Sequence, residues 1–91
     1  MTFVLIGPKR CPNCDEFGAK LTELGIPWGK VILDPVLHES LVEQAKSAGY
    51  MEAPLVCFKD ESGALTYIAA GLSPFAEMTA RKAYNALAPV G

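Results

Sequence analysis

The chain has 91 residues, of which 51% are hydrophobic and 20% are charged, and its formal net charge at pH 7 is −2. A chain of this length can build one hydrophobic core, so we expect a single domain over residues 1–91. Acidic and basic residues are interspersed without a basic stripe, which argues against a nucleic-acid partner. No apolar run reaches the roughly 20 residues of a membrane-spanning helix, and the start of the chain lacks a secretory signal pattern. We expect a cytoplasmic protein that acts as a monomer and binds no membrane.

A short strand followed by a helix is predicted at the start of the chain. Residues 2–6 are rich in β-branched and aromatic side chains, and a Gly-Pro pair ends the run. A helical pattern begins at Pro12 and ends before residues 25–27, where glycine and proline stop it. The apolar side of this helix is expected to carry Cys14, Phe17, Leu21 and Leu24. Gly18 inside the helix costs about 1 kcal/mol relative to alanine, so either another segment approaches the backbone there or packing compensates.

A second strand and a second helix follow. Residues 28–33 predict a strand, and Asp34 and Pro35 then suit the N-cap and the first turn of a helix that ends before Gly49. The apolar face of this helix is expected to carry Leu37, Leu41, Ala45 and Ala48.

The last part of the chain predicts a hairpin and a third helix. Residues 54–58 and 64–69 are two strands joined by the polar link 59–63, a separation that suits an antiparallel hairpin. Ser73 and Pro74 open the helix. Its buried side is expected to carry Ala80, Ala83, Tyr84 and Leu87. The order β-α-β-α-β-β-α predicts an α/β fold in which a mixed four-stranded sheet is flanked by three helices.

Two cysteines lie two residues apart in the sequence KRCPNC, residues 9–14, between the first strand and the first helix. A helix that begins at Pro12 makes Cys11 its N-cap and places the sulfur among unpaired backbone N–H groups. The helix terminus and a neighbouring cation, Lys9 or Arg10, both favour a negative charge there. Together they hold the pKa of the Cys11 thiol below that of a free cysteine. Cys11 is therefore the candidate nucleophile.

Cys14 is the candidate resolving thiol. It lies nearly one helical turn after Cys11, so the two sulfurs can close a small disulfide ring. It faces the apolar side of the helix, which makes it a poor first attacker. Once Cys11 has formed a mixed disulfide with a substrate, Cys14 is the nearest thiol able to displace it. In a reducing compartment such an adjacent pair is more typical of redox chemistry than of a static crosslink.

A zinc or iron–sulfur module is the non-enzymatic alternative. A tetrahedral zinc site needs about two ligands beyond a Cys-x-x-Cys pair, and the chain offers only Cys57 and His38, on different elements. We therefore assign no metal ligands. Cys57 lies within an apolar strand and is expected to be a small core residue. For His38 we expect a solvated or helix-capping role.

These features resemble the thioredoxin-fold superfamily and, within it, the glutaredoxin-like NrdH redoxins. The resemblance covers nearly the whole chain and includes the Cys-x-x-Cys sequence, GYMEAPLV at residues 49–56 and GLSP at residues 71–74. It implies a thioredoxin/glutaredoxin-like fold. It also implies a cis peptide bond before Pro54, which would pack beside the dithiol while the backbone of Ala53 pairs with the substrate chain. The residues expected to touch the partner are Lys9, Arg10, Pro12, Asn13, Ala53, Pro54, Gly71 and Leu72.

The activity that the resemblance implies is that of an enzyme, a thiol-disulfide oxidoreductase that supplies electrons to a protein disulfide. The substrate would be a ribonucleotide reductase or another disulfide-bearing protein, and thioredoxin reductase would recycle the dithiol. Because the dithiol itself carries the electrons, no cofactor is implied. Leu72 departs from the family's usual phenylalanine on the surface expected to dock thioredoxin reductase.

A glutathione-dependent glutaredoxin is the alternative enzyme. The residues that hold glutathione in that family are poorly matched, because Pro8 stands where a lysine is expected, Asn13 where a tyrosine is expected, and Pro74 where an acid is expected. Lys9 and Arg10 still offer cations to a glutathione carboxylate. Glutathione is therefore kept as a possible electron donor.

Overall fold

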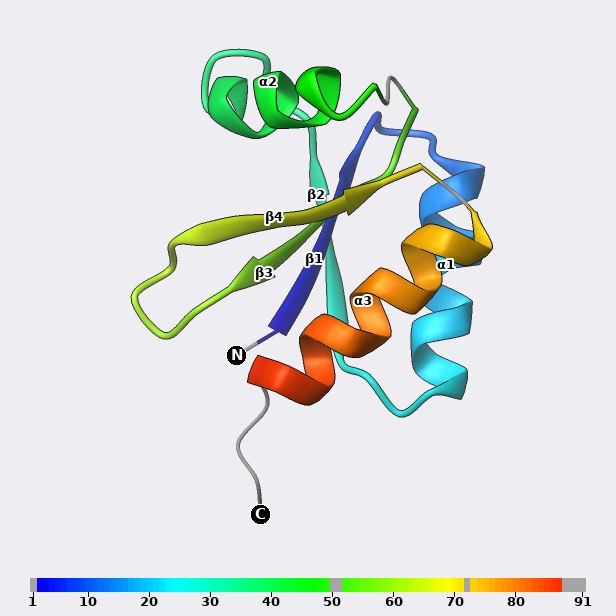
Figure 1. Ribbon diagram of the computed structural model, residues 1–91. Coiled ribbons are helices and arrows are strands. Elements are labelled where there is room, and N and C mark those ends of the chain that lie inside the picture. Colours follow the sequence, from blue (N-terminus) through cyan, green and yellow to red (C-terminus); the bar gives the residue numbers. More distant parts are fainter. Residues whose placement is uncertain (1, 50–51, 72, 88–91) are drawn as a thin grey trace.

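The computed structural model describes residues 2–49, 52–71 and 73–87 (Figure 1). Within these residues seven elements follow one another in the order β-α-β-α-β-β-α. The strands are β1 (Thr2–Gly7), β2 (Trp28–Ile32), β3 (Leu55–Lys59) and β4 (Leu65–Ala70), and the helices are α1 (Pro12–Glu23), α2 (Glu39–Ser47) and α3 (Pro74–Leu87). The predicted order of elements is confirmed.

The strands form one open, mixed sheet with the order β2-β1-β3-β4. β1 runs parallel to β2 and antiparallel to β3, and β3 and β4 form the predicted antiparallel hairpin. β1 is central and buried from Phe3 to Gly7 because its side chains are apolar on both faces. The predicted α/β class with a mixed four-stranded sheet and three helices is therefore confirmed. The Cys-x-x-Cys sequence follows shortly after β1, so the buried strand holds the start of that segment in place.

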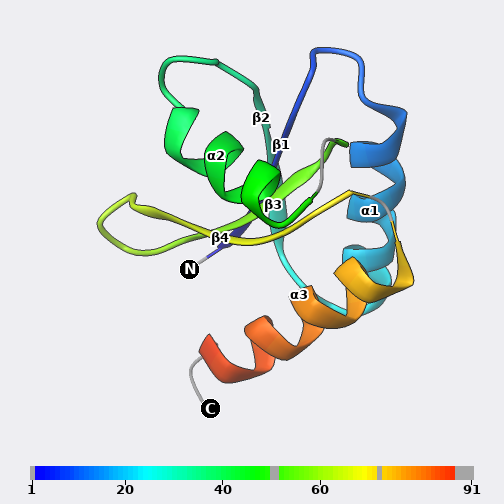
Figure 2. The same ribbon diagram turned by 45° about the horizontal axis from the view of Figure 1, so that its top comes forward.

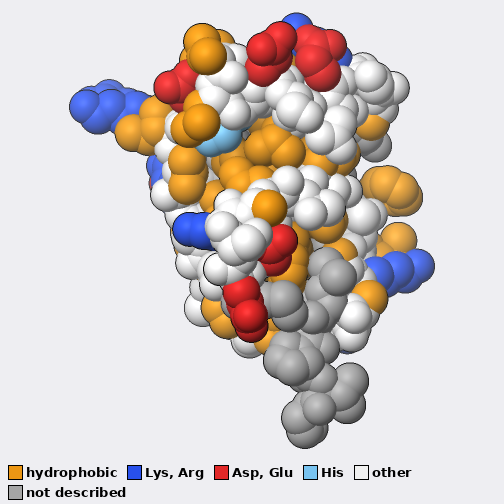
Figure 3. Space-filling model, turned by 90° about the vertical axis from the view of Figure 1, so that its left-hand side faces the viewer, with side chains coloured by type: hydrophobic (Ala, Val, Ile, Leu, Met, Phe, Trp, Pro, Cys, Tyr) orange, Lys and Arg blue, Asp and Glu red, His pale blue; other side chains and the backbone are white. Residues whose placement is uncertain are grey.

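The helices cover the two faces of the sheet unequally (Figures 1 and 2). α1 and α3 pack on one face and form the larger core with Phe3 and Leu5 of β1. α2 packs on the other face, over Val4 and Ile6. Figure 3 shows hydrophobic side chains open to the surface in a hollow below α2, next to the single histidine. The α2 face is therefore only partly covered.

Gly18 of α1 lies directly against Trp28 of β2. A Cβ atom built on Gly18 would overlap the indole ring. The indole N–H donates to Thr22 Oγ1 at 3.0 Å, and that hydroxyl donates to the Gly18 carbonyl at 3.0 Å. Close approach of another segment is therefore the reason for this glycine, and the contact fixes α1 against the edge of the sheet.

The start of α2 differs from the prediction, because the helix begins at Glu39. The Asp34 carboxylate accepts the N–H groups of Leu37 and Val36 at 3.1 and 2.9 Å, and these bonds hold the pKa of Asp34 below its usual range. Asp34 therefore opens a single turn that does not continue into α2.

His38 interrupts the helical pattern, because its φ and ψ of −105° and 19° are not helical. Its buried ring accepts the Asp34 N–H on Nδ1 at 3.0 Å. His38 occupies the N-cap position of α2, as one of the two predicted roles requires, but its side chain makes no capping bond. The prediction that the residue is solvated is wrong, because the ring is buried.

Three residues that we expected on buried helix faces are exposed. Leu37 lies in the turn before α2 and is 76% exposed, so the buried residues of α2 are Leu41 and Ala45. Ala48 is exposed at the C-cap of the same helix. Leu24, the C-cap of α1, is 38% exposed. These predictions are wrong because both helices are shorter than their apolar patterns.

α3 begins and packs as predicted. Ser73 Oγ accepts the N–H of Ala76 at 3.1 Å, which is the bond of an N-cap. Ala80 is fully buried in the larger core, and Ala83 and Tyr84 pack against that core while partly exposed. The predicted burial of Leu87 concerns a side chain outside the described part of the chain.

Candidate active site

The two cysteines of the Cys-x-x-Cys sequence form a disulfide at the amino end of α1. Cys11 is the N-cap, and its Sγ accepts the backbone N–H of Cys14 at 3.0 Å. The two Cα atoms are 5.1 Å apart. Pro12 occupies the start of the helix, where no N–H is needed. The Cys11 sulfur therefore lies where backbone donors and the helix dipole favour a negative charge.

Both cysteines are enclosed in the disulfide form. Cys14 is 0% exposed, as its apolar position on the helix predicts, and Cys11 is 4% exposed. Cys11 therefore keeps the larger accessible surface of the two, but that surface is small. The residues around the disulfide therefore cover most of the Cys11 side chain.

Gly7, the last residue of β1, lies directly against the disulfide. A Cβ atom built on Gly7 would lie 2.6 Å from Cys14 Sγ and 3.0 Å from Cys11 Sγ. Only a residue without Cβ lets both sulfurs pack on the end of the strand. From the sequence we expected Gly7 only to end the strand, so this contact was not predicted. The available signal was a glycine at the end of a buried strand, just before the Cys-x-x-Cys sequence.

The loop before β3 meets the dithiol from another side. The Ala53–Pro54 peptide bond is cis, as the resemblance implies, and Pro54 is fully buried. The Asn13 side-chain amide donates to the Ala53 carbonyl at 3.5 Å, which is a long hydrogen bond. The Gly71 N–H donates to the Pro54 carbonyl at 2.9 Å. Four of the predicted site residues, distant in sequence, are thus joined in one group next to the dithiol.

The remaining predicted site residues are less closely tied to the sulfurs. Lys9, Arg10 and Pro12 are exposed in the β1–α1 connection and at the start of α1. In the described part of the chain, the ion pairs involve other lysines, so Lys9 and Arg10 have no carboxylate partner there. Their predicted effect on the Cys11 thiolate stays a prediction. Leu72 lies outside the described residues.

The third cysteine, Cys57, is a fully buried free thiol in β3. Desolvation raises the pKa of Cys57 to about 12 from an ordinary value of 9.0. It belongs to the core cluster below α2, which confirms the prediction of a small core residue. Among the described residues, no group of three or more His, Cys, Asp and Glu side chains is placed to hold a metal ion.

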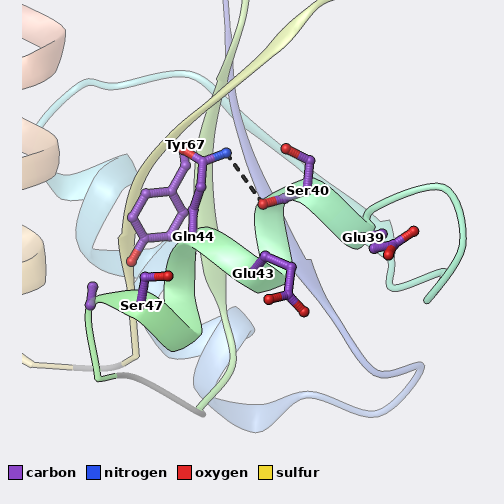
Figure 4. Close-up of a pocket in the computed structure, with 7 residues that line it drawn as sticks. Glu39, Ser40, Glu43, Gln44, Ser47 and Tyr67 are labelled. Carbon is purple, nitrogen blue, oxygen red and sulfur yellow. Dashed lines mark hydrogen bonds between the residues drawn. The ribbon is translucent and has the colours of Figure 1, made fainter.

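A broad, open hollow of about 810 Å³ lies along α2, away from the dithiol (Figure 4). Its lining residues are Glu39, Ser40, Glu43, Gln44, Ser47, Ala48 and Tyr67. The Gln44 amide donates to the Ser40 carbonyl at 3.3 Å and so stays along the helix. None of the residues around the disulfide lines this hollow, so it is not part of the candidate site.

Comparison of the chain with protein-family models, with curated proteins and with solved structures found no match. In the ranges that the structure describes, no helix is both long enough and apolar enough to cross a membrane. The case for a function therefore depends on the dithiol and on the residues around it.

Proposed function

We propose that the chain has a thioredoxin/glutaredoxin-like fold and is a thiol-disulfide oxidoreductase of the NrdH-redoxin type. The observation that carries the proposal is the Cys11–Cys14 disulfide at the amino end of α1, where Cys11 Sγ accepts a backbone N–H. The contact of Gly7 with both sulfurs supports it, because it fixes the disulfide against the end of β1. The buried Pro54, which directly follows Ala53, adds to that support. An enclosed, positioned dithiol suits repeated electron transfer better than a crosslink on the surface.

In the reduced protein, the Cys11 thiolate attacks one sulfur of the substrate disulfide. A Cys11–substrate disulfide forms, and the other substrate sulfur leaves as a thiolate that takes up a proton. The Cys14 sulfur, after losing its proton, then attacks Cys11 Sγ and releases the second substrate thiol. Two electrons pass from the dithiol to the substrate, and the protein ends as the Cys11–Cys14 disulfide. The backbone N–H that Cys11 Sγ accepts stabilises the Cys11 thiolate before its attack.

The proposed substrate is a disulfide of another protein, by resemblance that of a ribonucleotide reductase, in the cytoplasm. The proposed electron donor is thioredoxin reductase, which passes two electrons from NADPH to the disulfide, and the protein acts as a monomer. Lys9 and Arg10 support contact with an acidic partner surface because they are exposed and without a described carboxylate partner.

A coupled assay tests the proposal by comparing two electron donors. NADPH oxidation is followed with the chain and a protein disulfide, once with thioredoxin reductase and once with glutathione and glutathione reductase. Turnover with thioredoxin reductase that is lost in both Cys11→Ser and Cys14→Ser supports the proposal. Failure with reductases from several sources contradicts it.

One other outcome of this assay and one separate measurement identify the alternatives. Turnover with glutathione that is lost in Cys11→Ser but kept in Cys14→Ser assigns the chain to the glutathione-dependent enzymes, since a single thiol suffices for that route. Zinc or iron bound in stoichiometric amount, measured by native mass spectrometry and metal analysis, assigns the cysteines to a binding module.

A further inference from the structure

A second hollow, of about 390 Å³, lies beside the dithiol on the sheet face that α2 covers. Its apolar walls come from β1, β3, α2 and the residue after β2. These wall residues are Ile6, Leu33, Val42, Ala45 and Leu55. The Leu33 N–H donates to the Gly7 carbonyl at 2.8 Å, which ties this wall to the end of β1. The hollow is therefore built on the sheet and on α2, and we call it the side pocket.

The side pocket and the disulfide share two walls, Gly7 and Ala53. A Cβ atom built on Gly7 would lie 2.6 Å and 3.0 Å from the two sulfurs and 3.4 Å from Ala53 Cβ. Gly7 thus lies between the pocket and the sulfurs. A substrate chain that is bound covalently to Cys11 and passes Ala53 would also pass this lining.

The chemistry of the pocket favours an uncharged group. Its charged lining residues are Lys46 and Glu52, which have opposite signs and are exposed, so their ends reach water. The other lining side chains are apolar, apart from Gly7, which has none. Pockets for whole ligands measure about 300–1,000 Å³, and this one lies near the lower end of that range. The volume therefore leaves room for a bulky side chain, and the apolar lining favours one without charge.

We propose that the side pocket binds one bulky apolar side chain of the substrate protein, at a fixed distance along the chain from the substrate's disulfide-bonded cysteine. This inference rests on the proposed function, because the mixed disulfide at Cys11 holds the substrate chain in place. An extended chain rises about 3.3 Å per residue and its side chains alternate in direction. A residue within a few positions of the cysteine, and on the correct side, reaches the pocket. The substrate class is thus a disulfide with an apolar neighbour at one position.

Peptides that differ only in the place of one leucine test the inference. Each glycine-serine peptide carries one cysteine in a mixed disulfide with a chromogenic thiol, and the leucine moves through three positions on either side. Attack of Cys11 on the peptide sulfur releases the chromogenic thiol, and Cys14 then releases the peptide thiol. In single turnovers with the reduced chain, leucine at one position is expected to raise the rate about tenfold over the peptide without leucine.

Two variants of the pocket and one control locate the effect. Val42→Trp places a bulky ring in the pocket and narrows it. Leu33→Asp places a charge in the pocket wall, and the fold tolerates this change more readily because Leu33 is already 36% exposed. We compare the rate with the peptide that has leucine at the preferred position and the rate with the peptide without leucine. In both variants the ratio of these two rates is expected to fall to about one. Val36→Trp is the matched control, because Val36 is 84% exposed and outside the lining, and it is expected to keep the tenfold ratio.

The outcomes separate this inference from the proposed function. Equal rates for all leucine positions overturn the side pocket while leaving the oxidoreductase intact. A preference that survives in folded Val42→Trp or in folded Leu33→Asp also overturns it. No release of the chromogenic thiol from any peptide overturns the proposed function itself, and the side pocket with it.

Discussion

Cys11 and Cys57 are cysteines of one small domain with opposite environments. Cys11 Sγ lies at the start of α1 and accepts a backbone N–H, so its surroundings favour a negative charge. Cys57 lies in β3, where it pairs in register with Val4 and Tyr67 of the neighbouring strands. There burial raises the pKa of Cys57 to about 12. Both residues are almost fully buried, so the local hydrogen-bond donors and not the exposed area distinguish their surroundings.

Substitution of single cysteines gives the largest expected difference, which is in the rate of disulfide reduction. Cys11→Ser removes the attacking sulfur, so we expect reduction of a protein disulfide to fall at least about 1,000-fold, to the uncatalysed background. Cys14→Ser keeps the attack and is expected to accumulate a mixed disulfide, visible as added mass in the intact protein. Cys57→Ala is expected to keep the wild-type rate. Equal loss in Cys57→Ala and Cys11→Ser would contradict the division between the two thiols.

Selective alkylation sharpens the comparison in one sample. After mild reduction at pH 7, we expect iodoacetamide to modify Cys11 more than about 1,000 times faster than Cys57, because the thiolate is the reacting form. Peptide mapping of timed samples measures both rates, and the unfolded protein provides the control in which the difference disappears. Comparable rates in the folded chain would mean that Cys11 gains nothing from the helix terminus.

The difference between the two thiols was largely predictable from the sequence, because it depends on local features. The spacing of Cys11 and Cys14, with Pro12 at the start of the helix, is enough to place the first sulfur at an N-cap. An apolar strand around Cys57 is enough to predict burial. These features involve residues close in sequence, where helix and strand geometry fixes what meets.

Contacts between distant segments were not predictable in the same way. The packing of Gly7 on the sulfurs depends on where β1 and α1 meet, and the approach of Ala53 to Gly7 joins segments that are far apart in sequence. The start of α2 was missed because the His38 ring turns inward and accepts the Asp34 N–H instead of following the helical pattern. Each of these outcomes is decided by tertiary packing, which hydrophobic periodicity does not contain.

Substitution of Gly7 tests how strongly the strand end holds the dithiol. Gly7→Ala places a Cβ atom 2.6 Å from Cys14 Sγ, so we expect the oxidised protein to lose about 1–3 kcal/mol of unfolding free energy. Gly29→Ala in β2 is the matched control, because a Cβ atom there meets nothing within 4 Å and a strand gains roughly 0.5–1 kcal/mol from alanine. Neither glycine has a positive φ. Urea unfolding of the two variants measures the difference, and equal stability would show that the sulfurs have room to move.

The smallest expected effect is the pH dependence that Cys57 gives to stability. The folded pKa of about 12 exceeds the ordinary value of 9.0, so burial stabilises the protonated thiol. Its contribution is fully present below the ordinary pKa and is lost as the pH rises through the folded pKa. At pH 10 we expect the protein to have lost about 1.4 kcal/mol relative to pH 7 through this thiol.

Comparison with Cys57→Ala isolates the contribution of this thiol, because lysine and tyrosine side chains titrate alike in both proteins. Urea unfolding is measured for the two oxidised proteins at pH 7 and at pH 10, where the disulfide keeps Cys11 and Cys14 from titrating. The wild-type protein is expected to lose more stability between the two pH values than the variant does. If both lose the same amount, Cys57 ionises within the fold almost as it does in water. The difference between Cys57 and Cys11 would then be one of accessibility to other molecules and not of thiolate stability.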